Sequence, residues 1–147
     1  MVRRRRKKWL VTLIYKDAGM KKITALGRVL FAIPFAIFGI NHFIMMDYYV
    51  GMLTSFIPLG AYTIILTGIL LIGLSISLIF KFYIKQAALI LALLLLIFIG
   101  TIHIPNLIAG TDKAITLIAL LKDISLMGGS LMIAGMCSQA EEEISRN

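Results

Sequence analysis

Polar side chains that could do chemistry occur at three places inside long apolar stretches of this sequence. These places carry amide, imidazole, ammonium and carboxylate groups, on Asn41, His42, His103, Lys122 and Asp123. Such groups donate or accept hydrogen bonds, and imidazoles and carboxylates also exchange protons near neutral pH. Because polar groups are costly in lipid, they face protein or water there and mark candidate functional sites.

The elements that must position these groups follow from the composition. The chain has 147 residues, of which 60% are hydrophobic and 15% are charged, and its mean hydropathy is +0.96. A soluble domain of this length could not bury so much apolar surface, so a soluble enzyme is excluded. A membrane-spanning helix needs about 20 apolar residues. The sequence therefore predicts one all-α domain, a four-helix transmembrane bundle.

The apolar stretches set the expected spans at residues 24–46, 60–80, 86–104 and 116–137. Pro34 predicts a kink in the first span, and Pro105 is expected to end the third. Gly73 and Ser77 lie four residues apart, so the second span should have a small-residue face where another helix approaches closely. The expected domain is 24–137, preceded by a basic segment 1–23 and followed by an acidic tail 138–147.

The basic residues predict the orientation of the chain. Of 15 Lys and Arg residues, ten lie within the first 28 positions, and the net charge is +8. Basic segments stay on the cytoplasmic side, so both termini should be cytoplasmic, in the cell (inner) membrane. The expected partner of the basic segment is anionic lipid rather than nucleic acid. Its candidate headgroup ligands are Arg3, Arg4, Arg5, Arg6, Lys7, Lys8 and Arg28, and residues 9–22 should form a short interfacial segment.

Chain direction places the polar groups of all three stretches in the outer half of the bundle. Adjacent helical residues point about 100° apart. If Asp123 faces the interior, Lys122 should lie at the edge and extend toward the outer headgroups. Asp123 then needs a donor, which His42 or His103 could supply. Two interpretations remain open: a polar clamp that fixes helix order, and a ligand-binding or proton-handling site.

The residue types also limit the ligand. Two histidines on facing helices could ligate a haem iron, but the sequence has no CxxCH motif and few other metal ligands. The single Cys137 excludes dithiol chemistry. A quinone headgroup needs only hydrogen-bond donors beside an apolar slot. In that interpretation, His42 donates to a quinone carbonyl.

Two stretches of the sequence resemble the DoxX-like family of small four-span membrane proteins. One is GRVLFAIPFAIFGINHF at 27–43, and the other is LLKDISLMGGSLMIAG at 120–135. The resemblance covers most of residues 24–137. It implies a four-helix bundle, similar in some members to the membrane subunit of thiosulfate:quinone oxidoreductase. It also implies that Arg28, His42, Lys122 and Asp123 are functional positions.

The leading expectation is therefore a membrane subunit of a quinone-linked redox complex, associated with other membrane subunits. A small-solute carrier or channel that uses the polar outer cavity is a second possibility. A purely structural or assembly subunit is a third. The sequence contains no self-contained catalytic motif, since phosphate-binding loops, GxSxG and HExxH are all absent.

Overall fold

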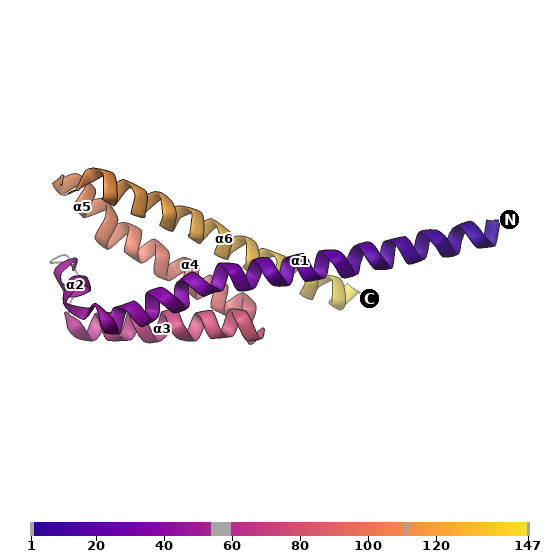
Figure 1. Ribbon diagram of the computed structural model, residues 1–147, viewed down its shortest axis with the longest axis horizontal. Coiled ribbons are helices and arrows are strands. Elements are labelled where there is room, and N and C mark those ends of the chain that lie inside the picture. Colours follow the sequence, from indigo (N-terminus) through magenta and orange to yellow (C-terminus); the bar gives the residue numbers. More distant parts are fainter. Residues whose placement is uncertain (1, 54–59, 111, 147) are drawn as a thin grey trace.

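The computed structural model describes residues 2–53, 60–110 and 112–146, with side chains described from residue 19 onward except those of 142–144. All regular structure in these residues is helical, which confirms the all-α prediction (Figure 1). The helices are α1 (Val2–Ile44), α2 (Met46–Gly51), α3 (Ala61–Phe80), α4 (Ile84–Phe98), a π-helical turn η1 (Ile99–His103), α5 (Ile104–Ala109) and α6 (Lys113–Arg146).

Four helical segments are long and apolar enough to cross a membrane. They are Gly19–Ile44, Ala61–Phe80, Ile84–Ala109 and Lys113–Glu141. Large apolar side chains also cover their outward faces, and residues such as Leu66 and Leu93 are more than half exposed. Such surfaces are stable in lipid and costly in water. The chain is therefore a multi-pass membrane protein.

The spans are arranged as two antiparallel pairs. Helix α1 packs along α3, and α4 packs along α6, while α3 contacts α4 next to the turn at residues 81–83. Figure 1 shows that the pairs meet at the end that holds both chain termini and separate at the end that holds α2 and α5. We call these the termini end and the loop end.

The apolar core fills the half of the bundle nearer the termini end. Phe35, Leu78 and Leu91 are almost completely buried in it, together with small alanines of α1, α4 and α6. Two hydrogen bonds cross from α1 to α3 here: Ser75 Oγ donates to Ala32 O at 2.8 Å, and Arg28 Nη1 donates to Ile79 O at 3.2 Å. The core fixes the two pairs together at this end and leaves the other half of the bundle for a site.

Helix α1 approaches α3 closely at two glycines. A Cβ atom on Gly39 would lie 2.9 Å from the carbonyl oxygen of Gly68, and one on Gly68 would lie 2.8 Å from the Phe43 ring. The expected small-residue face at Gly73 is not used for packing, because Gly73 is exposed and a Cβ atom added to it would have no neighbour within 4 Å. The predicted close approach at Gly73 is therefore wrong, and the glycine of this helix that meets α1 is Gly68.

Pro34 and Pro105 both lie inside helical structure. Helix α1 continues through Pro34 to Ile44. Pro105 does not end the third span, because the π-helical turn just before it places the proline in the first turn of α5, where its missing N–H is not needed. The chain then stays helical to Ala109, so the second loop is much shorter than residues 105–115.

The helices also extend beyond the expected ends of the membrane domain. Residues 9–22 belong to α1 rather than to a separate interfacial segment, and the acidic tail 138–147 continues α6 as far as Arg146. The first expected loop, 47–59, contains α2, and its residues 54–59 lie outside the described chain.

Candidate functional site

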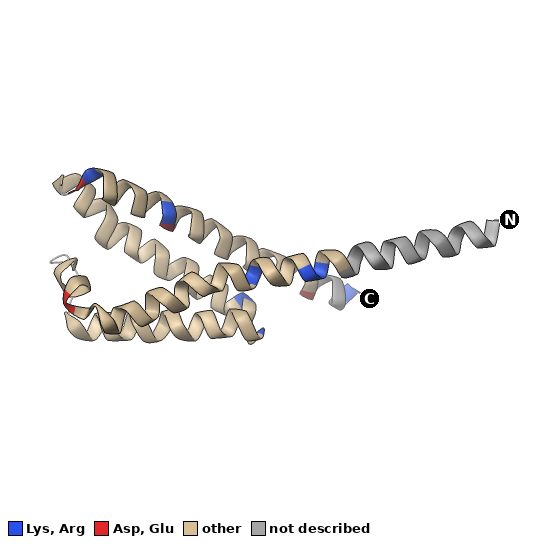
Figure 2. Ribbon diagram, in the orientation of Figure 1, with Lys and Arg blue, Asp and Glu red and all other residues tan. Residues whose placement is uncertain are grey.

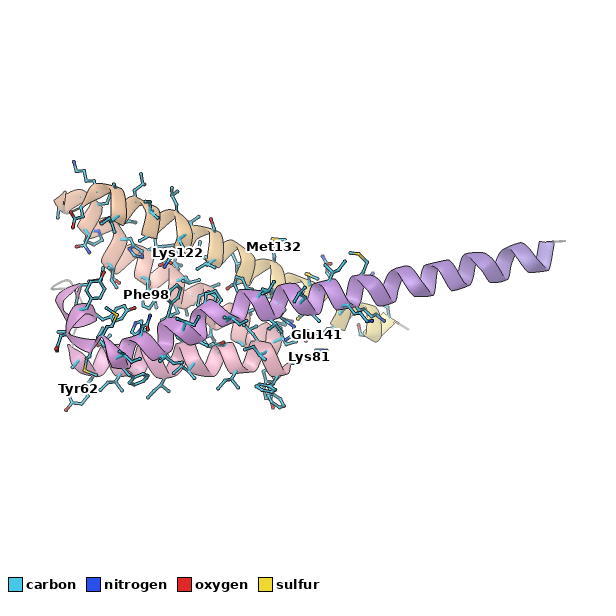
Figure 3. The ribbon with its side chains drawn as sticks, in the orientation of Figure 1. Tyr62, Lys81, Phe98, Lys122, Met132 and Glu141 are labelled. Atoms are coloured by element: carbon cyan, nitrogen blue, oxygen red, sulfur yellow. The ribbon has the colours of Figure 1, made fainter. Side chains whose placement is uncertain are left out.

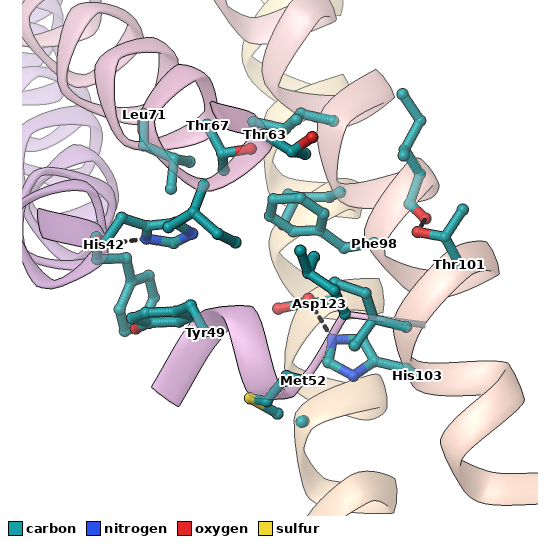
Figure 4. A pocket seen from close by; sticks show the side chains of 18 of the residues that line it. His42, Tyr49, Met52, Thr63, Thr67, Leu71, Phe98, Thr101, His103 and Asp123 are labelled. Atoms are coloured by element: carbon teal, nitrogen blue, oxygen red, sulfur yellow. Dashed lines mark hydrogen bonds and ion pairs between the residues drawn. The ribbon is translucent and has the colours of Figure 1, made fainter. Parts of the chain in front are cut away.

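A cavity of about 520 Å³ lies between the two helix pairs in the loop-end half of the bundle. It exists because the pairs separate there while the core fills the opposite half. Its walls are mainly apolar and come from α1, α2, α3, α4, η1 and α6. Figure 4 shows the polar groups at two places on these walls, with His42 on one side and Asp123 with His103 on the other.

Asp123 is the centre of the polar group on the α4–α6 side. It is buried, with 4% of its surface exposed. His103 Nε2 lies 2.8 Å from Asp123 Oδ2, and Lys122 Nζ lies 3.2 Å from Asp123 Oδ1. Because a carboxylate only accepts, His103 Nε2 donates its hydrogen to it. Both carboxylate oxygens are thus bonded to donors, and of the two histidines considered from the sequence, His103 is the partner.

Lys122 differs from the sequence-based expectation. Its ammonium group turns inward and lies 4.6 Å from the centroid of the Phe38 ring, on the opposite helix pair. It therefore contacts both α1 and Asp123 instead of extending to the outer headgroups. The side chains of Lys122 and Asp123 leave the helix in different directions, but the four-carbon side chain of Lys122 is long enough to bring its ammonium back to the carboxylate. About half of the Lys122 side chain, 46%, remains exposed.

The π-helical turn η1 positions His103. A π-helical turn accommodates one extra residue, which rotates the chain after it relative to the preceding α-helix. The turn ends at His103 and is followed directly by α5. Thr101 Oγ1 donates to Ile97 O at 2.7 Å within the same segment. Such turns are frequent at functional sites, and this one brings the imidazole to the buried carboxylate.

His42 occupies the other wall and is 6% exposed. Its Nδ1 lies 2.7 Å from Phe38 O, and its ring stacks on Tyr49 with centroids 4.1 Å apart and planes inclined by 14°. A carbonyl can only accept, so Nδ1 carries a hydrogen. His42 does not bond to Asp123. Of the two donors that the sequence left open for Asp123, His103 makes the contact and His42 does not.

Several cavity residues were not identified from the sequence. Tyr48 and Tyr49 on α2 and Thr67 on α3 all line it, and Figure 4 shows Tyr49 against His42. Burial, followed by the neighbouring Tyr48, raises the pKa of the Tyr49 phenol, so its hydroxyl stays protonated at neutral pH. Only the tertiary structure reveals the two tyrosines, because α2 lies in a segment that the sequence indicated to be loop.

Two further candidate residues, Asn41 and Arg28, are not part of the cavity wall. Asn41 is half-buried but does not line the cavity. Arg28 lies at the termini end, where it bonds the Ile79 carbonyl, so the structure places it away from this site. The side chains of Arg3, Arg4, Arg5, Arg6, Lys7 and Lys8 lie outside the described residues.

The polar groups of the cavity are spread over opposite walls (Figure 4). Among the described residues, no three His, Cys, Asp or Glu side chains come together as a metal site. Nε2 of His103 is bonded to Asp123, so Nδ1 is the nitrogen that remains to bind a metal ion. An apolar cavity with a few polar groups on opposite walls is typical of sites for small organic molecules.

Comparison with protein-family models, curated protein sequences and solved structures found no match to this chain.

Proposed function

We propose that this chain is an integral membrane subunit of a quinone-linked redox complex and that its loop-end cavity binds the headgroup of a quinone or a similar lipid-soluble ligand. The proposal rests on one observation: a largely apolar cavity of about 520 Å³ that receives an imidazole from one helix pair and an imidazole, a carboxylate and an ammonium from the other. This volume is in the range of small-molecule sites.

In this proposal the quinone headgroup and its hydrocarbon tail occupy different parts of the site. The polar groups lie on opposite walls of the cavity, where a flat ring between them could bond both walls. Lys122 lines the cavity and also has 46% of its side chain exposed. On this proposal a hydrocarbon tail leaves the cavity beside Lys122 and enters lipid, which suits a lipid-soluble ligand.

The DoxX-like resemblance supports the same function. Its stretch at 27–43 ends with His42 beside the cavity, and its stretch at 120–135 contains the Lys122–Asp123 pair. On this proposal the chain associates with other membrane subunits in the cell membrane. Its basic segment would bind anionic headgroups on the cytoplasmic side.

The test measures ligand binding to the purified full chain. A benzoquinone with a ten-carbon tail should raise the melting temperature of the wild-type protein in detergent. Ala119→Trp should abolish this rise, because Ala119 lines the cavity on α6 and an indole would occupy the ligand's space. Ala114→Trp is the matched control, since Ala114 is exposed on the same helix and does not line the cavity.

Other outcomes would point to the other function classes. A wild-type protein that shows no stabilisation by the quinone, and contains no quinone after lipid extraction, would reject the proposal. Solute flux in liposomes would then indicate a carrier. Stable partner proteins without any ligand would indicate a structural or assembly subunit.

A further inference from the structure

The hydrogen-bonding state of His42 can be read from its partners. Nδ1 donates to the Phe38 carbonyl at 2.7 Å. In a neutral imidazole with hydrogen on Nδ1, the second nitrogen, Nε2, has a lone pair and accepts hydrogen bonds. Figure 4 shows that this nitrogen points into the cavity. No described residue is seen to bond it.

The surroundings of His42 favour the neutral ring. A second proton would make it a cation, and a buried cation needs a counter-charge. The one carboxylate that the described residues place on the cavity wall is Asp123, and His103 and Lys122 already occupy its two oxygens. Tyr49 covers one face of the imidazole, but its phenol stays protonated and supplies no charge.

The ring is also fixed in its orientation. The His42 Cβ would lie 3.0 Å from a Cβ on Gly68, so α3 closes behind the side chain, and Tyr49 stacks on the ring. The bond to Phe38 sets the rotation of the ring. Nε2 is therefore a preorganised acceptor, and an acceptor in a largely apolar site discriminates against ligands that cannot donate to it.

The opposite wall, on α6, offers a hydrogen-bond donor instead of an acceptor. The Lys122 ammonium is a donor with three hydrogens, and its contacts with Asp123 and the Phe38 ring leave donor capacity toward the cavity. The two walls thus suit a ligand with a hydroxyl hydrogen on the α1 side and an oxygen acceptor on the α6 side. A quinol has both, whereas a quinone has only acceptors.

We propose that His42 Nε2 accepts a hydrogen bond from a ligand hydroxyl, so that the cavity selects phenols and quinols over ethers and quinones. The extension of this inference from phenols to a quinol rests on the proposed function. It reverses the role expected from the sequence, in which His42 donates to a quinone carbonyl. His42 is a specificity-determining residue in this account, and no electron or proton transfer is required of it.

The test uses two ligands that differ at one oxygen, where a methyl group replaces the hydroxyl hydrogen. The full chain in detergent is titrated calorimetrically with 4-decylphenol and with its methyl ether, 4-decylanisole. The phenol should bind about tenfold more tightly, which corresponds to one hydrogen bond to an otherwise unsatisfied buried acceptor. His42→Asn keeps an amide N–H near the Nδ1 position, for the bond to Phe38, but has no atom at the Nε2 position. It should bind both ligands equally.

Tyr62→Phe is the control variant. Tyr62 is exposed on α3 at the loop end and points away from the molecule (Figure 3), so the tenfold preference should remain. Equal binding of phenol and ether to the wild type would overturn the inference. Retention of the preference in a folded His42→Asn variant, or no binding of either probe, would also overturn it.

A second ligand pair separates this inference from the proposed function. The quinol and quinone forms of the decyl benzoquinone are titrated anaerobically in the same way. A phenol preference without binding of quinol or quinone would reject the proposed function and keep the acceptor role of His42. Equal binding of quinol and quinone, together with equal binding of phenol and ether, would keep the quinone site and reject the acceptor role.

Discussion

At the residue scale, Asp123 is the side chain on which the α4–α6 wall depends. Its two oxygens accept from His103, on the third span, and from Lys122, its neighbour in sequence. The two donors differ in their surroundings, because the His103 side chain is 12% exposed and that of Lys122 is 46% exposed. Removing the carboxylate would leave a buried donor without a partner, whereas removing the ammonium would expose one carboxylate oxygen at the edge of the cavity.

This difference gives a prediction for two variants. Asp123→Ala should lower the free energy of unfolding by about 2–3 kcal/mol, because the buried His103 N–H loses its acceptor. Lys122→Ala should cost about 1 kcal/mol or less, because its ion pair is half-exposed. Unfolding in mixed detergent measures both values. Equal effects of the two substitutions would contradict this account of the site.

At the element scale, the packing of α1 on α3 depends on Gly39, which lies against the backbone of α3. Gly39 faces the carbonyl oxygen of Gly68 and the backbone nitrogen of Ile72, atoms that cannot move without displacing α3. Gly73 on α3 is exposed. The Gly39 contact also fixes the wall that holds His42, since Gly68 packs against the His42 and Phe43 side chains.

We expect opposite results from alanine at the two positions. Gly39→Ala should destabilise the protein by about 1–3 kcal/mol, because its Cβ would overlap backbone atoms of α3. Gly73→Ala should leave stability unchanged or raise it slightly, since alanine favours helix and nothing lies within 4 Å of the added atom. Melting temperatures in one detergent measure both. A Gly39→Ala variant as stable as the wild type would show that α1 and α3 are not this close.

At the scale of the whole molecule, most basic residues of the described chain lie at the same end as both chain termini. Figure 2 shows that most Lys and Arg positions coloured on the ribbon lie toward the termini end. These are Lys21, Lys22, Arg28, Lys81, Lys85 and Arg146. Near the tip of the loop end are Asp47, Asp112 and Lys113. The Lys85–Glu141 ion pair, 2.8 Å long, also joins α4 to α6 at the termini end.

This charge distribution predicts that the termini end is cytoplasmic. In a Cys137→Ala background, a membrane-impermeant thiol reagent added to intact cells should label Asp47→Cys, on exposed α2, and should fail to label Ser145→Cys near the end of α6. Permeabilised cells serve as the control, because both cysteines should then react. Labelling of Ser145→Cys in intact cells would require the inverted orientation.

The fold class and the number of spans follow from the amino-acid sequence alone, because long apolar stretches in lipid can satisfy their backbone hydrogen bonds only as helices. The sequence also identified His42, His103, Lys122 and Asp123 as polar residues at similar depth. The pairing of these residues could not be predicted. A one-residue insertion in η1 rotates His103 toward Asp123, a long flexible side chain brings Lys122 inward, and the Phe38 carbonyl takes the hydrogen of His42.

The cavity and the residues of its walls depend on how the helix pairs pack in three dimensions. A long run of apolar residues shows that a helix lies in a bilayer, but lipid and protein are equally apolar, so the run cannot show which face meets another helix. The two glycines that bring α1 against α3, and the tyrosines of α2 that cover His42, are therefore visible only once the helix pairs are placed in space.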